Sequence, residues 1–384
     1  MTTPNPTFLH EVPSLASRPG YLFHCGVAPI TRRAAEALEL CAHELTTDPW
    51  STFTHRLKRI HAARSAAARL INAPSAQDVA FVKSTTHGLL LVAQSLDWDD
   101  GDCIIVEETT FPANWYAWTP LFERCGVRVI PWPERAHRYE LEDLERLLAR
   151  HTVRMVALSA ADYATGFRHD LHAVGTMIKN AGALFCLDAI QAVGCLPVDV
   201  QAIQADFLSA DGHKWMLGPE GAGILYVNPE MHPELNDSMS GWLGRERFQE
   251  YENRRLAPPA TALRFEEGAL NIPGNLALGG SLELLNEVGM ETIWERVQAN
   301  RAAVVQWGAE QGLKLISHYS PENQSGIVAF EFPKGVQGDS VVKRAAERGV
   351  IVSSRRGFLR IAPHFYQEQE HVREALRVLG DLLR

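Results

Sequence analysis

Short apolar runs alternate with amphipathic segments along the first three quarters of the chain. Runs rich in Val, Ile, Leu and Phe that stop at polar or turn residues are typical of β-strands. Seven such runs occur: DVAFVKS (78–84), CIIVEET (103–109), VRVIPW (127–132), RMVALSA (154–160), ALFCLDA (183–189), ADFLSAD (205–211) and GILYV (223–227). Segments with helical spacing precede and separate several of them, for example residues 32–45, 53–71, 141–151 and 171–182. Apolar strands separated by helices predict an α/β fold with a mostly parallel seven-stranded sheet that is covered on both faces.

The pattern changes near residue 290. A long helix (290–312) is followed by two short strands, GIVAFEF and FLRIAP, and by a final helix. A chain of 384 residues is also longer than one hydrophobic core usually supports. We therefore predict a large domain over residues 20–285 and a smaller α+β domain over residues 286–384. The N-terminal arm, residues 1–19, is expected to belong to the smaller domain.

Composition and charge exclude several classes of partner. The formal net charge is −9 and no basic run occurs, which disfavours nucleic acid and acidic membrane surfaces. No segment is long and apolar enough to predict a membrane span, and the first 20 residues lack the features of a secretion signal. The six cysteines show no spacing suited to zinc. We expect a cytoplasmic chain with reduced thiols and no metal site.

Charged and polar side chains follow three of the predicted strands. Asp188 is the penultimate residue of ALFCLDA, and Lys214 follows ADFLSAD. A third strand ends at TTHG (85–88), directly before the apolar run LLLVAQSL. A buried lysine has a lowered pKa and can act as a nucleophilic amine, and a helix N-terminus with hydroxyl groups binds anions. Taken singly, each feature has an ordinary structural explanation, such as a helix cap or a lysine whose stem lies in the core.

Together, the three features form one constellation. Ligands of open α/β sheets bind at the carboxyl ends of the strands, so an amine, a carboxylate and a phosphate cradle are expected at one edge of the sheet. Pyridoxal 5′-phosphate requires this set, because a lysine forms its Schiff base, an acidic group keeps its pyridine nitrogen protonated, and a helix start anchors its phosphate. The sequence therefore predicts a pyridoxal-phosphate site that includes Lys214 and Asp188.

Most of the chain resembles a known family. The motifs include YLFHCGVAPITRRAAEAL, FVKSTTHGLLLVAQSLDWDDGD, LDAIQAVGCLPVDV, DGHKWMLGPEGAGILYV and LRIAPHFYQEQEHV. The sequence is similar to class V aminotransferases among the fold type I pyridoxal-phosphate enzymes, in the cysteine desulfurase and selenocysteine lyase branch. The resemblance implies a fold type I transferase architecture, pyridoxal 5′-phosphate as cofactor and Lys214 as the lysine that binds it.

The resemblance also implies roles for residues around the cofactor. Asp188 pairs with the pyridine nitrogen, and Gln191 donates a hydrogen bond to the phenolate oxygen of the ring. Thr86 and His87 bind the phosphate, and His213 donates a further hydrogen bond to it. Two positions depart from the family pattern: Asp211 stands where a phosphate-binding serine is usual, and Ala269 stands in place of a threonine. Ser84 or Thr85 would then complete the phosphate site.

Three further positions follow from the same resemblance. Phe111 occupies the catalytic position at which desulfurases stack a proton-shuttling histidine on the ring, so it can stack but cannot transfer a proton. Arg360 matches the arginine that binds the substrate α-carboxylate, a contact that suits its planar fork. Asn271 matches a cofactor-site position that often comes from the second subunit, which implies a homodimer with its active sites near the interface.

The residues narrow the reaction but leave alternatives. Desulfurases need a mobile cysteine before the carboxylate arginine, whereas residues 349–360, GVIVSSRRGFLR, contain none. We therefore expect an aminotransferase-like enzyme that acts at the α-carbon of a small amino acid, with Lys214 as general acid and base. A C–S (β-)lyase or an epimerase of the isopenicillin N epimerase type is the alternative. Cysteine desulfurase chemistry is less favoured, and a non-catalytic scaffold is least favoured because the site residues occur together.

Overall fold

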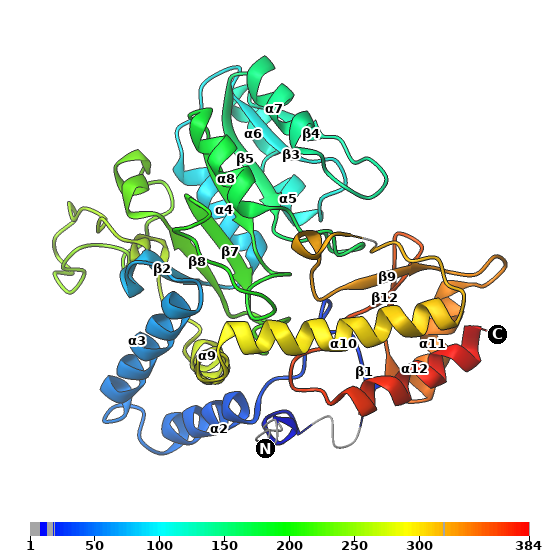
Figure 1. The fold of residues 1–384 in the computed structure, drawn as a ribbon. Coiled ribbons are helices and arrows are strands. Elements are labelled where there is room, and N and C mark those ends of the chain that lie inside the picture. Colours follow the sequence, from blue (N-terminus) through cyan, green and yellow to red (C-terminus); the bar gives the residue numbers. More distant parts are fainter. Residues whose placement is uncertain (1–7, 14–17, 19, 318, 384) are drawn as a thin grey trace.

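The fold is built around a seven-stranded sheet (Figure 1), in a computed structural model that describes residues 8–13, 18, 20–317 and 319–383. In spatial order, its strands are β2 (Val79–Val82), β8 (Gly223–Val227), β7 (Phe207–Asp211), β6 (Leu184–Asp188), β5 (Val153–Ser159), β3 (Cys103–Glu107) and β4 (Arg128–Trp132). Neighbours from β7 to β4 are parallel, and β8 is antiparallel to both β2 and β7. The predicted mostly parallel sheet of seven strands is confirmed.

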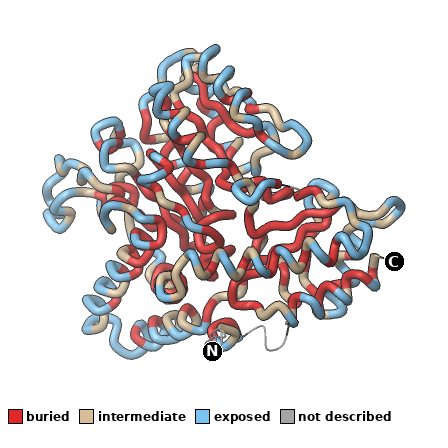
Figure 2. The backbone as a smooth tube through the Cα atoms, viewed as in Figure 1, coloured by how far each residue is buried: buried red, intermediate tan, exposed pale blue. Residues whose placement is uncertain are grey.

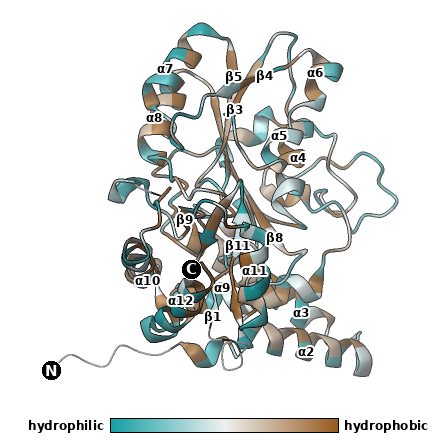
Figure 3. Cartoon of the chain, turned by 90° about the vertical axis from the view of Figure 1, so that its right-hand side faces the viewer, coloured by the Kyte–Doolittle hydropathy of each residue, from teal (hydrophilic) through white to brown (hydrophobic). Residues whose placement is uncertain are grey.

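Alternation along each strand divides the sheet into two buried faces, because successive side chains point to opposite sides. In β5, Met155 and Ala157 belong to one apolar cluster, and Val156 and Leu158 belong to another. The helices that cover the sheet and continue below it are α2 (Arg32–Thr47), α3 (Phe53–Leu70), α4 (Thr85–Ser95), α5 (Ala113–Tyr116), α6 (Pro120–Cys125), α7 (Leu141–Arg150), α8 (Leu171–Asn180) and α9 (Ile272–Val288). Strands β2, β3, β7 and β8 are buried at every residue, whereas the edge strand β4 is partly exposed (Figure 2). The helices show both apolar and polar surfaces (Figure 3).

The last part of the chain forms a smaller α+β unit with its own apolar cluster, which includes Val304, Phe330 and Leu379. Its elements are α10 (Met290–Glu310), β9 (Val328–Glu331), α11 (Gly338–Glu347), β10 (Val350–Ile351), β11 (Ser353–Arg355), β12 (Phe358–Ile361) and α12 (Gln369–Leu383). Strands β11, β12 and β9 form an antiparallel sheet, and β1 (Gly20–Tyr21) pairs with β10. Short 3₁₀ helices complete the fold: η1 (Leu9–Glu11), η2 (Ala76–Asp78), η3 (Pro229–Glu234), η4 (Ala262–Phe265) and η5 (Pro321–Asn323).

The division into domains stays a prediction. The boundary expected after residue 285 falls within the last turn of α9. Of the predicted N-terminal arm, residues 1–7, 14–17 and 19 lie outside the described residues. Among the helices that the structure describes, none has both the length and the apolar character needed to cross a membrane.

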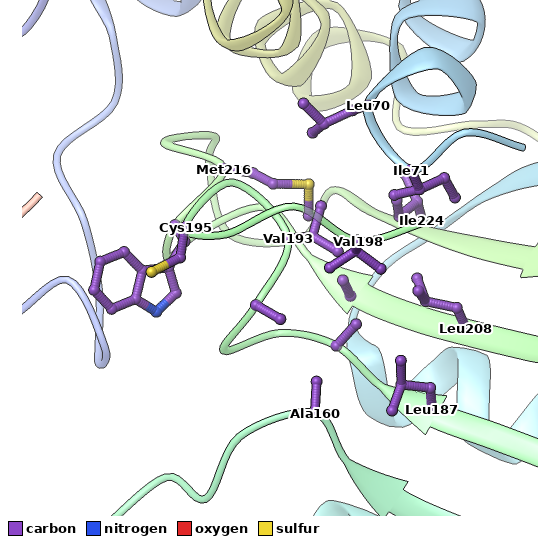
Figure 4. Close-up of a cluster of buried hydrophobic side chains, with 14 of the residues drawn as sticks. Leu70, Ile71, Ala160, Leu187, Val193, Cys195, Val198, Leu208, Met216 and Ile224 are labelled. Atoms are coloured by element: carbon purple, nitrogen blue, oxygen red, sulfur yellow. The ribbon is translucent and has the colours of Figure 1, made fainter. Parts of the chain in front are cut away.

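Apolar side chains hold the loops that follow β6 and β7 against the strand ends. Val193 and Cys195, after β6, and Met216, after β7, lie over the core that contains Leu187 and Leu208 (Figure 4). All five side chains are at most 2 % exposed. Burial on this scale fixes the loop backbone, so the polar residues between the strands and these apolar anchors are held in defined positions.

Candidate active site

A cavity of about 290 Å³ lies at the carboxyl ends of β6 and β7. Its lining combines residues from both units of the fold: Cys25, Gly26, Ser84, Thr85, Thr86, Phe111, Ala113, Tyr163, Asp188, Ile190, Gln191, Asp211, His213, Lys214, Arg355 and Arg360. A larger hollow of about 930 Å³ lies among residues 237–256, but none of the predicted site residues lines it. The smaller cavity is therefore the candidate active site.

Lys214 and Asp188 face this cavity from adjacent strand ends. Lys214 is 9 % exposed, and burial lowers the pKa of its amine, while the nearby Asp188 carboxylate acts in the opposite direction. Asp188 is 3 % exposed, and burial raises the pKa of its carboxyl group to about 6, although the Ile190 N–H and Lys214 oppose this rise. Asp188 Oδ1 accepts the Ile190 N–H at 3.1 Å. The two groups thus form a buried amine and carboxyl pair whose charged forms are both penalised by burial.

Gln191 is fixed in the wall beside this pair. Its Nε2 donates to the Cys25 carbonyl oxygen at 3.0 Å, and its Oε1 accepts from Trp215 Nε1 at 2.9 Å. The residue is buried. These two bonds orient the amide group and leave one N–H of Nε2 available for a ligand.

The N-terminus of α4 forms a second wall. Ser84 is its N-cap and accepts the His87 N–H at 3.1 Å, and Thr85 Oγ1 accepts the Asp211 N–H at 3.0 Å. Thr86 also lines the cavity, whereas His87 is not among the lining residues. His87 Nδ1 instead accepts the Lys83 N–H at 3.4 Å, and burial lowers the pKa of the imidazole.

Asp211 and His213 explain how an acidic residue can stand beside this helix start. His213 Nδ1 lies 3.1 Å from Asp211 Oδ2, a close polar contact without hydrogen-bond geometry. Asp211 Oδ1 and His213 Nδ1 are buried, and neither has a hydrogen-bond partner among the described residues. Buried polar atoms of this kind usually have a partner, so the pair points to a ligand that is polar on this side.

Arg360 and Phe111 close the cavity from other directions. Arg360 is 2 % exposed, its Nε donates to Ser353 Oγ at 2.9 Å, and its Nη1 donates to the Tyr163 carbonyl oxygen. Among the residues that the structure describes, no carboxylate pairs with Arg360. Phe111 is 42 % exposed, and its ring centroid lies 5.7 Å from Lys214 Nζ and 5.2 Å from the Tyr163 ring centroid.

Asn271 lies apart from the cavity of its own chain. It is the exposed N-cap of α9, and its Nδ2 donates to the Gly221 carbonyl oxygen at 2.9 Å. Ala269 is also exposed. Any role for this segment at a cofactor site would require a second chain.

Sequence reasoning missed six residues of the lining: the apolar Gly26, Ala113 and Ile190, and three with functional side chains, Cys25, Tyr163 and Arg355. Cys25 is 1 % exposed, and burial raises the pKa of its thiol, with Arg360 and Lys214 acting in the opposite direction. The motif YLFHCGVAPI contains Cys25, but its position in the sequence gave no sign that it lies beside Lys214. The local sequence SSRRGF, with Gly357 at a turn, could have indicated the hairpin that carries Arg355.

The lining fits pyridoxal 5′-phosphate. The phosphate requires donors, which the first turn of α4, its hydroxyl groups and His213 supply. The pyridine nitrogen requires an acid, which Asp188 supplies, and the aldehyde requires a primary amine, which Lys214 supplies. The Asp211 N–H donates to Thr85 Oγ1, which places Asp211 beside the α4 N-terminus, and His213 Nδ1 lies 3.1 Å from its carboxylate. No three His, Cys, Asp or Glu side chains of the described part of the chain gather in a way that could hold a metal ion.

Comparisons with known proteins agree with this fold. The family model "Aminotransferase class-V" matches residues 21–378. The "Uncharacterized aminotransferase YcbU" of Bacillus subtilis is 30 % identical over 83 % of this chain and 83 % of its own length. A "Probable cysteine desulfurase" of Methanothermobacter thermautotrophicus is 31 % identical over 81 % of this chain and 73 % of its own length. Among solved structures, the apo cysteine desulfurase of Thermococcus onnurineus superposes with a TM-score of 0.89 at 21 % identity, covering 100 % of this chain and 99 % of that one.

Proposed function

The chain belongs to the aminotransferase class-V family, and from this premise we propose that it is an aminotransferase-like enzyme that acts at the α-carbon of a small amino-acid substrate. As a member of the family it is a pyridoxal-phosphate-dependent enzyme of the transferase or lyase type. One observation carries the finer proposal. Lys214, Asp188 and Arg360 are all buried, all face one cavity, and supply the amine, the acid and the carboxylate receptor that such a reaction needs.

The cofactor, when bound, supplies an electron-withdrawing ring that acidifies the α-carbon of an attached amino acid. Asp188 holds the proton on the ring nitrogen through a charge-assisted hydrogen bond. Lys214 would hold the cofactor through its primary amine, and the free amine would move the proton at the substrate α-carbon. Its lowered pKa favours the neutral amine that these steps require.

Other residues of the lining, above all Arg360, orient the substrate. Arg360 binds the α-carboxylate through its planar guanidinium group. Because Ser353 and the Tyr163 carbonyl oxygen already fix this group, binding costs little side-chain entropy. Phe111 packs over the cofactor ring without exchanging protons, and Thr85, Thr86, His213 and the first turn of α4 bind the phosphate.

Cysteine desulfurase chemistry is the second candidate, because Cys25 lines the cavity and several relatives carry that name. The Cys25 thiol is buried and its pKa is raised, so it is a poor sulfur acceptor at neutral pH. With L-cysteine as substrate, we expect any sulfur that is released to appear as free sulfide, together with pyruvate and ammonia. Alanine in amounts equal to the cysteine consumed, with a persulfide on Cys25 detected by intact-protein mass spectrometry, would favour the desulfurase instead.

A homodimer in the cytoplasm is part of the same proposal. Asn271 is exposed and lies outside the cavity of its own chain, as expected of a residue that completes the site of a second copy. The six free cysteines suit a reducing compartment. Light scattering coupled to size-exclusion chromatography tests the dimer, and a monomer at micromolar concentration would exclude it.

The experiment that tests the reaction is a screen of amino acids with the purified holoenzyme. Loss of the cofactor absorbance band on mixing reports binding and proton removal, while assays for keto acid, ammonia, sulfide and the D-enantiomer separate transamination, lyase and epimerase reactions. The Lys214→Ala variant is the matched control. Keto acid formed in proportion to the aminated cofactor supports the proposal, and the absence of any Lys214-dependent change with any amino acid overturns it.

A further inference from the structure

The hairpin of β11 and β12 brings a second arginine to the cavity. Ser353 pairs with Arg360 and Arg355 pairs with Phe358 across this antiparallel hairpin. Paired residues, and residues two apart on one strand, share a face of a sheet. Arg355 and Arg360 therefore lie on the same face, as diagonal neighbours with Cα atoms about 7–8 Å apart. Both residues line the cavity.

The turn of the hairpin fixes this arrangement. Arg356 and Gly357 have φ values of 53° and 81°, as a two-residue turn between paired strands requires. Arg356 then pairs with Glu134, with Nη1 to Oε2 at 2.9 Å and Nη2 to Oε1 at 3.0 Å. This bidentate contact ties the hairpin to the large unit, so the neighbouring Arg355 is held at the cavity.

Arg355 differs from both neighbouring arginines in its contacts. Its Nη1 donates to the Ser354 carbonyl oxygen at 2.8 Å, and no described carboxylate lies in ion-pair distance of it. Burial raises the pKa of Tyr163, and among the opposing charges are those of Arg356, Arg360 and Arg355. Three positive groups therefore act on Tyr163, and only Arg356 has a carboxylate partner among the described residues.

The acidic side chains that line the cavity have other neighbours than Arg355: Asp188 is assigned to the ring nitrogen, and Asp211 Oδ2 lies 3.1 Å from His213 Nδ1. The α4 N-terminus is assigned to the phosphate and Arg360 to one carboxylate of the substrate, so Arg355 is left without an anionic partner among the described residues. We propose that Arg355 binds a second carboxylate, so that the substrates are α-amino acids whose side chain ends in a carboxylate group. This specificity rests on the proposed function, because Arg360 must bind the α-carboxylate.

Binding of unreactive analogues to the holoenzyme tests this inference without turnover. Glutarate carries two carboxylates, and its monoamide has the same shape with only one. We expect calorimetry to give a dissociation constant at least about tenfold lower for glutarate than for the monoamide. The Arg355→Gln variant should abolish this preference, and should lower kcat/KM for L-glutamate and L-aspartate by about tenfold or more but that for L-glutamine by less than about threefold, because a charge-assisted bond contributes about 1.5–3 kcal/mol.

The matched control is Arg348→Gln, which removes the same charge from an exposed residue that does not line the cavity and should keep the full preference. Equal affinity of the wild-type enzyme for the two analogues, or a preference that survives in Arg355→Gln, would overturn the inference alone, since the cofactor and turnover of neutral amino acids would persist. A protein without Lys214-dependent cofactor binding, or without turnover of any amino acid, would overturn the proposed function and this inference with it.

Discussion

The strand ends of β6 and β7 and the β11–β12 hairpin face the same cavity but hold their charged groups differently. Asp188 ends β6 and Lys214 lies in the loop after β7, both next to the largest apolar cluster, and burial shifts the pKa values of both. The hairpin belongs to the smaller unit, and on it Arg360 is buried whereas Arg355 is exposed. Arg356, in its turn, forms an ion pair with Glu134 of the larger unit.

The two regions therefore have different roles: the strand ends carry out proton transfer, and the hairpin binds the substrate. Groups that must exchange protons need a dry, rigid setting, because burial moves their pKa values toward neutrality. Groups that bind substrate carboxylates need permanent charge and directional donors, which guanidinium groups provide even near water. Changes at the strand ends should therefore affect kcat, and changes on the hairpin should affect KM.

The largest effect is expected from Lys214→Ala. The variant should lose the borohydride-reducible cofactor linkage and about 10³-fold in kcat, because positioned general acid–base groups contribute about 10²–10⁴-fold. Absorbance after borohydride reduction and single-turnover kinetics measure the two losses. Far-ultraviolet circular dichroism should match the wild type. A reducible linkage at the wild-type level would assign the cofactor to another lysine.

Asp188→Asn should lower kcat by about 10–100-fold, since the amide loses a charge-assisted bond of about 1.5–3 kcal/mol. The same change should stabilise the cofactor-free protein. The pKa of Asp188 is raised to about 6, so the folded protein binds more protons than the unfolded chain between about pH 4 and pH 6, and the stability falls as the pH rises through this window. Above pH 6, the burial of the charged Asp188 carboxylate destabilises the folded protein to its full extent.

Urea unfolding at pH 7 and pH 4 measures this cost. At pH 7, Asp188→Asn should raise the free energy of unfolding by about 2–3 kcal/mol, because one pKa unit corresponds to about 1.4 kcal/mol. At pH 4 the gain should be much smaller. A variant that is as active as the wild type would contradict the pairing with the cofactor, and a gain that does not depend on pH would contradict the raised pKa.

Arg360→Lys sharpens the comparison from the hairpin side. A lysine retains the charge but not the planar fork, so KM for α-carboxylated amino acids should rise by about tenfold. Decarboxylated amines should be affected far less, because they present no carboxylate to Arg360. Steady-state kinetics with both kinds of substrate measure this difference in KM. An equal rise in KM for both kinds would mean that Arg360 has a structural role only.

The smallest effect is expected from Arg356→Gln. Partly exposed ion pairs contribute about 0.2–1 kcal/mol, so KM should rise by about two- to fivefold while kcat stays within about twofold. Glu134→Gln should raise KM by at least as much, because Glu134 also accepts from Thr109 Oγ1 and lies 3.1 Å from His137 Nδ1. The double variant should be no worse than Glu134→Gln alone, as expected when Arg356 acts through Glu134. A fall in kcat without a change in KM would mean that the hairpin contributes to the chemical step.

The sequence by itself determined the sheet and the residues at its edge. Apolar runs such as ALFCLDA and ADFLSAD predict their own strands, and parallel strands bring their carboxyl ends to one edge. Asp188 and Lys214 could therefore be assigned to one site from local pattern and spacing. The motif resemblance added Arg360, whose burial without a carboxylate partner among the described residues is what a substrate receptor requires.

Only the tertiary structure decided which distant residues join them. Two contacts bring Cys25 to the cavity. Phe23 forms an isolated β-bridge with Ala362, and the Cys25 carbonyl oxygen accepts a hydrogen bond from Gln191. His87, which the motif assigns to the phosphate, is not among the lining residues. These outcomes depend on pairings between segments far apart in the chain, which local hydrophobic pattern does not encode. Arg355 shares a face with Arg360 for the same reason: the register of one hairpin sets which side chains lie together.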